Sequence, residues 1–61
     1  MTDAQRMKTL REDLGLTQSE MAEKLGYNSQ SAISDIERGE KKLSNVARQF
    51  LHYIIEQELH D

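Results

Sequence analysis

Apolar residues recur at helical spacing in four stretches of the chain, and glycines separate these stretches. In the first stretch, Met7, Leu10 and Leu14 follow the i, i+3, i+7 spacing that places side chains on one face of a helix. The chain has three glycines, at Gly15, Gly26 and Gly39. Each follows an apolar-periodic segment, where glycine commonly ends a helix because it adopts the left-handed conformation without steric cost. The pattern therefore predicts four helices.

The starts of the first two helices carry a recognisable capping pattern. Thr2 and Gln5 have the spacing of a capping box, and the same spacing recurs at Thr17 and Glu20. These pairs predict one helix over about residues 3–14 and a second helix that begins at about Thr17 and is barely two turns long.

The third and fourth helices follow from the same reasoning. Ser29 is the expected N-cap of a helix over about residues 30–38, with Ile33 and Ile36 on its inner side. The longest apolar-periodic segment covers about residues 44–59. No stretch alternates apolar and polar residues for long, so the sequence predicts an all-α fold, a compact four-helix domain.

The size of the chain bears on its assembly. A single domain over residues 1–61 buries only about 60% of the surface that its unfolded chain exposes. The chain has no cysteine, so no disulfide can stabilise so small a core. The remaining supports are good helix packing or oligomerisation, and a homodimer is expected.

The predicted last helix has two apolar faces about 100° apart. The face expected to close the core comprises Leu43, Val46, Phe50 and Ile54. The face expected to form a dimer interface comprises Leu51, Ile55 and Leu59, with His52 and Tyr53 near its rim. A twin chain is the simplest cover for the second face, because one self-complementary patch makes a two-fold dimer. The alternative is a partly exposed end of the helix.

The link between the second and third helices is short, which suggests a helix-turn-helix over about residues 17–38. The exposed arc of the third helix holds only small or polar side chains and one arginine: Gln30, Ser31, Ser34, Asp35 and Arg38. Short side chains let a helix approach a surface closely, and Gln, Ser and Asp can each bond base edges in the major groove. The same residues are equally compatible with a helix cap followed by a polar turn.

The formal net charge of -3 at first argues against a nucleic-acid partner, because basic side chains supply much of the affinity for phosphates. The acidity lies mostly at one end of the chain, however. Residues 43–61 carry Arg48 as their single basic residue (not counting His), against Glu56, Glu58 and Asp61. A locally positive face therefore remains possible elsewhere.

Residues 10–44, "LREDLGLTQSEMAEKLGYNSQSAISDIERGEKKLS", closely resemble the helix-turn-helix of the Cro and cI phage-repressor family, also called the XRE family. The specific pieces are "LGLTQSEMAEKLG", "SQSAIS" and "IERGEKK". The resemblance implies a DNA-binding transcriptional regulator, usually a dimer on an inverted-repeat operator. A repressor that also controls its own gene is the expectation from the family.

The resemblance also implies roles for individual residues. The candidates for base contacts are Gln30, Ser31, Ser34 and Asp35. The candidates for phosphate contacts are Gln18, Asn28, Ser29, Arg38, Lys41 and Lys42. Arg11 and Glu37 are expected to form a structural ion pair. The turn is one residue longer than in many members, at Tyr27 or Asn28, which leaves two registers open for the base-facing residues.

Other functional classes have little support. No nucleophile-base pair, metal cluster or phosphate-cradling glycine loop is present in the sequence, so we expect no enzyme activity, no metal and no cofactor. No small-molecule ligand is evident, and the absence of a long apolar run predicts a cytoplasmic protein without a membrane segment. The alternative function is an antitoxin-like or other protein-interaction module on the same fold.

Overall fold

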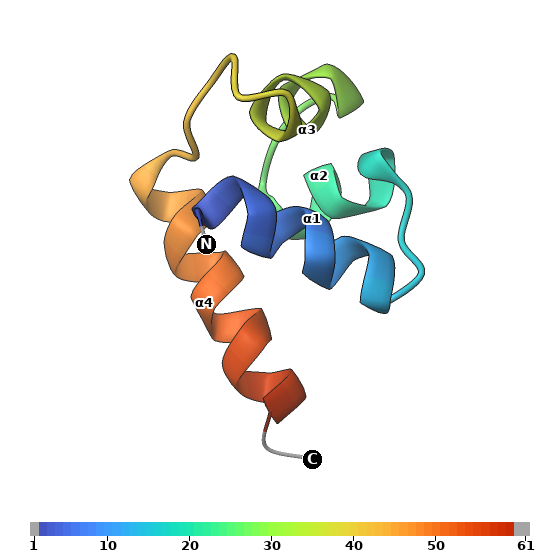
Figure 1. Cartoon of the computed structure of the whole chain (residues 1–61), viewed down its shortest axis with the longest axis vertical. Coiled ribbons are helices and arrows are strands. Elements are labelled where there is room, and N and C mark those ends of the chain that lie inside the picture. The colour runs from blue at the N-terminus through green and yellow to red at the C-terminus, as the bar shows by residue number, and fades with distance from the viewer. Residues whose placement is uncertain (1, 60–61) are drawn as a thin grey trace.

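The structure, a computed structural model, describes residues 2–59, apart from the side chain of Leu59. This part of the chain contains four helices and no strand: α1 (Asp3–Asp13), α2 (Gln18–Leu25), α3 (Gln30–Glu37) and α4 (Asn45–Leu59). The predicted all-α fold is confirmed. In Figure 1, α1 runs through the middle of the molecule, α2 and α3 lie together at one end, and α4 extends away toward the other.

Both predicted capping boxes are present. The Thr2 hydroxyl accepts a hydrogen bond from the backbone N–H of Gln5 at 3.1 Å, and the Gln5 side chain accepts one from the N–H of Thr2 at 2.9 Å. The same pair of bonds joins Thr17 and Glu20, at 3.1 and 2.8 Å. The backbone and hydroxyl of Thr17 stabilise the charged Glu20 carboxylate and lower its pKa below the ordinary value. Local hydrogen bonds thus fix where α1 and α2 begin.

Gly26 and Tyr27 together end α2. Gly26 has φ +80°, in the left-handed region, and its N–H donates to the Glu23 carbonyl at 3.3 Å. The N–H of Tyr27 donates to the Ala22 carbonyl at 2.8 Å. These two bonds form a Schellman motif, in which the residue after glycine commonly packs back on the helix. Tyr27 packs in this way, and its side chain is half-buried against the core.

All four helices contribute to the hydrophobic core. The buried residues are Met7, Leu10, Met21, Ala22, Leu25, Ile33, Ile36, Ala47 and Leu51. Burying each of the larger side chains contributes about 1.5–3 kcal/mol of transfer free energy. The methionines of α1 and α2 are fully buried, at 0% exposure, so they pack as core side chains.

The prediction of which face of α4 closes the core was wrong for Val46 and Phe50, although Leu43 and Ile54 do pack against the core. Val46 and Phe50 are 61% and 46% exposed, whereas Ala47 and Leu51 are 1% and 0% exposed. The helix is therefore turned by less than one residue from the predicted orientation, and the face that closes the core includes Ala47, Leu51 and Ile54. The small side chain of Ala47 explains the difference, because it lets α4 approach the other helices closely and brings Leu51, one turn later, into the core.

This orientation also corrects the predicted dimer face. Leu51 cannot form a dimer interface, because it is fully buried within its own protomer. Ile55 is partly buried and packs against the core. His52 and Tyr53 are exposed, and the side chain of Leu59 lies outside the described part of the structure. The exposed apolar face of α4 consists instead of Val46, Phe50 and Tyr53, at 61%, 46% and 59% exposure.

Candidate nucleic-acid interface

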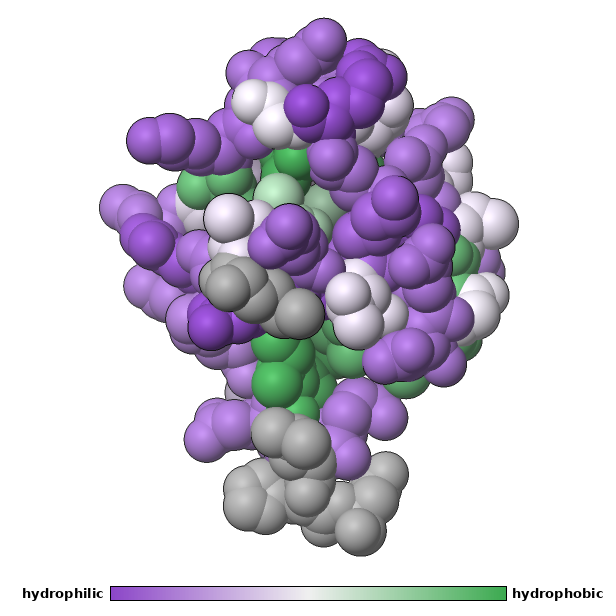
Figure 2. Space-filling view, in the orientation of Figure 1, coloured by the Kyte–Doolittle hydropathy of each residue, from purple (hydrophilic) through white to green (hydrophobic). Residues whose placement is uncertain are grey.

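The exposed face of α3 carries the residues predicted to read bases, and it lies at the end of the molecule opposite the tip of α4 (Figure 1). Gln30 and Ser31, in the first turn of α3, are exposed, and Ser34 and Asp35, one turn later, are half-buried. Figure 2 shows that mostly hydrophilic residues cover this end, whereas hydrophobic surface appears directly below it and again lower, toward the tip of α4. Since α3 is only eight residues long, these side chains form one small polar surface.

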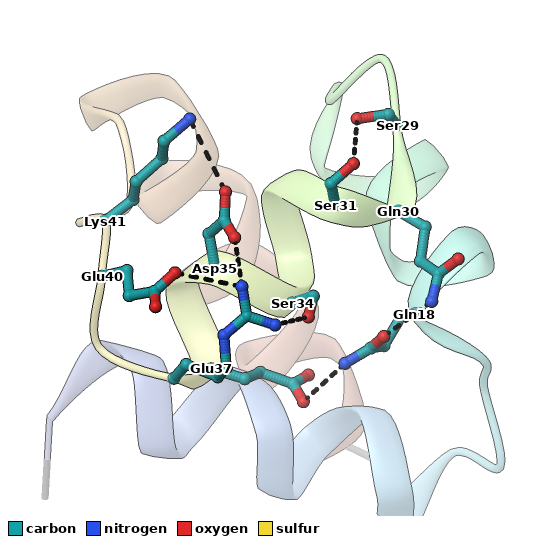
Figure 3. A network of polar contacts seen from close by, with 10 residues as sticks. Gln18, Ser29, Gln30, Ser31, Ser34, Asp35, Glu37, Glu40 and Lys41 are labelled. Carbon is teal, nitrogen blue, oxygen red and sulfur yellow. Dashed lines mark hydrogen bonds and ion pairs between the residues drawn. The ribbon is translucent and has the colours of Figure 1, made fainter.

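Gln18 joins the starts of α2 and α3. The Gln30 amide donates a hydrogen bond to the Gln18 side-chain oxygen at 2.9 Å, and the Gln18 amide donates to a Glu37 carboxylate oxygen at 3.1 Å. Figure 3 shows Gln18 between Gln30 on one side and Glu37 on the other. Gln18 therefore holds the side chain of Gln30 in place at the exposed start of α3.

Arg11 and Glu37 form the expected ion pair. Arg11 Nε lies 2.8 Å from Glu37 Oε2, and Arg11 Nη2 donates to Glu37 Oε1 at 3.3 Å. A third bond runs from Arg11 Nη1 to the Leu16 carbonyl at 3.0 Å. The two side chains are only 15% and 7% exposed, so little water screens the pair. This bidentate contact fixes the end of α3 against α1.

A second polar cluster surrounds the guanidinium of Arg38. Arg38 Nη1 donates to Ser34 Oγ at 2.6 Å, and Arg38 Nη2 donates to Asp35 Oδ1 at 2.6 Å and to Glu40 Oε2 at 3.0 Å. Lys41 Nζ lies 3.7 Å from the other Asp35 oxygen, Oδ2. The hydrogen bond and the charge of Glu40 raise the pKa of Arg38 above its ordinary value. In Figure 3, the Ser34, Asp35 and Glu40 side chains converge on one point beside α3.

The turn before α3 is held by Tyr27. The Tyr27 hydroxyl accepts a hydrogen bond from the backbone N–H of Ser44 at 3.1 Å, which ties the turn to the start of α4. Asn28 and Ser29 are exposed, and Ser29 takes the predicted N-cap position of α3 without a side-chain capping bond. Its hydroxyl lies 3.4 Å from that of Ser31. Of the two candidate extra residues, Tyr27 therefore faces inward and Asn28 outward.

The predicted phosphate-contacting residues do not form a strongly basic surface. Residues 27–42 contain three basic residues, Arg38, Lys41 and Lys42. They also contain three acidic residues, Asp35, Glu37 and Glu40, so their formal charges cancel. Lys41 and Lys42 are exposed directly after the end of α3. Hydrogen-bonding geometry, more than net positive charge, characterises this surface.

Sequence reasoning missed two contributors to this surface. Tyr27 was noted only as a possible extra turn residue, although an aromatic residue directly after the helix-ending glycine is a signal for a side chain that packs inward. Glu40 was missed as an acceptor for Arg38, because it lies in the irregular segment after α3, where spacing predicts no contact.

Among residues 2–58, no group of His, Asp and Glu side chains could hold a metal ion, and no helix is long and apolar enough to cross a membrane.

Comparison with known proteins agrees with this geometry. The family model HTH_3, described as helix-turn-helix, matches residues 7–46, which include most of α1, all of α2 and α3, and the first residues of α4. Comparison with curated proteins gave no match, and comparison with solved structures gave none.

Proposed function

The chain belongs to the XRE-type helix-turn-helix family of DNA-binding transcriptional regulators, and we propose that it acts as a repressor that binds an inverted-repeat operator as a homodimer. In this proposal, α3 enters the major groove and its exposed face contacts the base edges. Bound over a promoter, the dimer obstructs RNA polymerase, and control of its own gene follows where the operator overlaps its own promoter.

The observation that carries the proposal is the exposed start of α3, where Gln18 positions Gln30. The Gln18–Gln30 bond leaves the Gln30 oxygen available to accept a bond and one amide hydrogen available to donate one. An amide with both capacities can pair with the N6 and N7 edge of adenine. Ser31 is exposed beside it and can donate or accept. Gln30 and Ser31 are therefore proposed to read bases at one end of each half-site.

Phosphate contacts are proposed on both sides of these residues. Gln18, in the first turn of α2, stands beside backbone N–H groups at the positive end of the helix dipole, where a phosphate oxygen is favoured. Asn28 and Ser29 are exposed before α3, and Lys41 and Lys42 are exposed after it. Contacts of this kind fix the protein on the duplex without reading its sequence.

The exposed apolar face of α4 is proposed as the dimer interface, in place of the face expected from the sequence. Val46, Phe50 and Tyr53 follow i, i+4, i+7 spacing, so they form one stripe on the side of α4 that faces away from the core. A second copy that packs the same stripe against this one forms a two-fold dimer. Such a dimer presents two α3 helices to major grooves about 34 Å apart on an inverted repeat.

Selection of bound sequences from a random pool of DNA duplexes tests this function. The wild-type protein, at about 150 mM salt to limit non-specific binding, is expected to enrich an inverted repeat. The variant Gln30→Ala with Ser31→Ala is expected to lose the preference at positions symmetric about its centre, while remaining folded. Thr9→Ala, which removes an exposed hydroxyl on α1, is the matched control and keeps the wild-type preference. No enrichment by a folded wild-type dimer contradicts the proposal and favours the protein-interaction module.

A further inference from the structure

The second turn of α3 presents its side chains differently from the first. Ser34 Oγ and Asp35 Oδ1 both accept hydrogen bonds of 2.6 Å from the guanidinium of Arg38. Gln30 and Ser31 have no such contact with a cation in the described structure. The two halves of the exposed face of α3 therefore meet DNA with different groups.

Asp35 is poorly placed to read a base itself. Its side chain is only 21% exposed, and a cation lies next to each carboxylate oxygen, Arg38 at Oδ1 and Lys41 at Oδ2. Accepting a hydrogen bond from a cytosine amino group would require the carboxylate to give up a charge-assisted bond. A carboxylate released from its cations near the DNA backbone would also be repelled by the phosphates. The geometry thus makes Asp35 a holder of Arg38.

Arg38 is accessible to solvent, as are Glu40 and Lys41 beside it. The Arg38 side chain is 55% exposed. A guanidinium has five N–H donors, and Ser34, Asp35 and Glu40 accept three bonds, so two donors remain, one at Nε and one at Nη1. These two lie on different edges of the planar group, so a bidentate pair also requires the Nη2 donor that Glu40 holds. Arginine pairs bidentately with the O6 and N7 atoms of guanine, which are both acceptors. A guanidinium already held by neighbouring residues loses less conformational entropy when it forms such a pair.

The charges of the cluster argue against a simple phosphate contact. Arg38 and Lys41 contribute two positive charges, and Asp35 and Glu40 contribute two negative charges, so the cluster is formally neutral. A neutral cluster gains little from the release of counterions, which is the source of sequence-independent affinity. The cluster presents directed N–H donors to DNA. Directed hydrogen bonds to base edges can distinguish one base from another.

We propose that Arg38 reads a guanine in the major groove and that Asp35 is the positioning residue that orients its guanidinium. Glu40 is 60% exposed and holds the guanidinium by the longest of the three bonds, at 3.0 Å. The acceptor edge of guanine replaces the Glu40 carboxylate when DNA binds, whereas Ser34 and Asp35 keep their bonds. This inference rests on the proposed function. It predicts that each half-site contains a guanine in addition to the bases read by Gln30 and Ser31.

The test uses the sequence enriched by the wild-type chain and a panel of duplexes that each carry one symmetric base-pair substitution. Binding is measured at about 150 mM salt for the wild type, Arg38→Lys and Asp35→Asn. The wild type is expected to discriminate against substitution of one G·C pair by about fivefold to 150-fold. Arg38→Lys is expected to lose most of this discrimination, because lysine lacks the bidentate fork. Asp35→Asn is expected to reduce the discrimination at the same pair and at no other.

Arg48→Lys is the matched control. Arg48 is also an exposed arginine that bonds a residue three positions earlier, Asn45 at 2.6 Å, but it lies on α4, away from α3. The Arg48→Lys variant is expected to keep the wild-type preference among the duplexes.

Equal weakening of all duplexes by Arg38→Lys overturns the inference and makes Arg38 a phosphate contact. A loss of cytosine preference in Asp35→Asn, with the guanine preference intact, assigns base reading to Asp35 instead. Absence of any preferred sequence for the folded wild type refutes the proposed function itself.

Discussion

At the scale of single residues, one chain of polar contacts holds the candidate DNA-binding face to the rest of the molecule. It runs from Gln30 through Gln18 to Glu37 and ends at Arg11, which also bonds the Leu16 carbonyl. Glu37 is central, because its two carboxylate oxygens accept from both Arg11 and Gln18. The orientation of Gln30, which is proposed to read a base, thus depends on a carboxylate that is only 7% exposed.

Glu37→Gln is expected to destabilise the fold by about 3 kcal/mol, because it leaves the guanidinium of Arg11 partly buried without a counter-charge. Chemical denaturation with circular dichroism measures the change in the free energy of unfolding. Replacing both partners, Arg11→Met with Glu37→Leu, is expected to recover part of the loss, because no buried charge then remains unpaired. Glu12→Gln, at an exposed position of α1, is the control, and an equal cost for the two glutamine variants would contradict the expectation.

At the scale of elements, α4 serves two surfaces at once. One side closes the core with Ala47 and Leu51, and the other side exposes Val46, Phe50 and Tyr53. The two sets of residues alternate along the same few turns, so neighbouring residues have opposite roles. Phe50 and Leu51 are consecutive in the sequence, yet their side chains are 46% and 0% exposed.

Alanine substitutions at these two positions are expected to separate stability from assembly. Leu51→Ala is expected to cost about 2–5 kcal/mol of folding free energy, because it opens a cavity in the core. Phe50→Ala is expected to change the stability of the isolated protomer by under about 1 kcal/mol and to weaken the dimer at least tenfold. Thermal unfolding at low concentration and sedimentation over a concentration series measure the two effects. A Phe50→Ala chain that dimerises as tightly as the wild type would rule out the proposed interface.

At the scale of the whole molecule, an acidic chain is proposed to bind a polyanion. The net charge is -3, and residues 27–42 are formally neutral. A surface of this kind gains less than a basic one from counterion release, so its affinity must come in larger part from directed hydrogen bonds. Each exposed acidic residue near α3 is therefore expected to have a measurable effect on binding.

Glu40→Gln is expected to tighten binding to the selected operator about threefold to tenfold at about 50 mM salt, because Glu40 repels phosphates and holds the guanidinium of Arg38. The gain is expected to shrink as the salt concentration rises, since screening weakens the repulsion between exposed charges. Fluorescence anisotropy over a salt series measures both quantities. Glu56→Gln removes the same charge near the far end of α4 and should show a smaller gain, and equal gains would assign the effect to net charge alone.

The sequence by itself determined the four helices, the two capping boxes and the position of the helix-turn-helix, because each depends on residues only a few positions apart. Thr17 and Glu20 form their hydrogen bonds within one turn of the helix, and Gly26 ends α2 through its own backbone conformation. It also predicted the pairing of Arg11 with Glu37, through family resemblance.

Only the tertiary structure decided which face of α4 points inward and which groups surround Arg38. Two apolar faces about 100° apart were both candidates for the core, and the small side chain of Ala47, which is 1% exposed, lies on the face that points inward. The bonds of Arg38 to Ser34, Asp35 and Glu40 depended on the path that the chain takes after α3. Side chains brought together by packing and by the turn after a helix have no fixed spacing in the sequence, so their contacts are set only when the chain has folded.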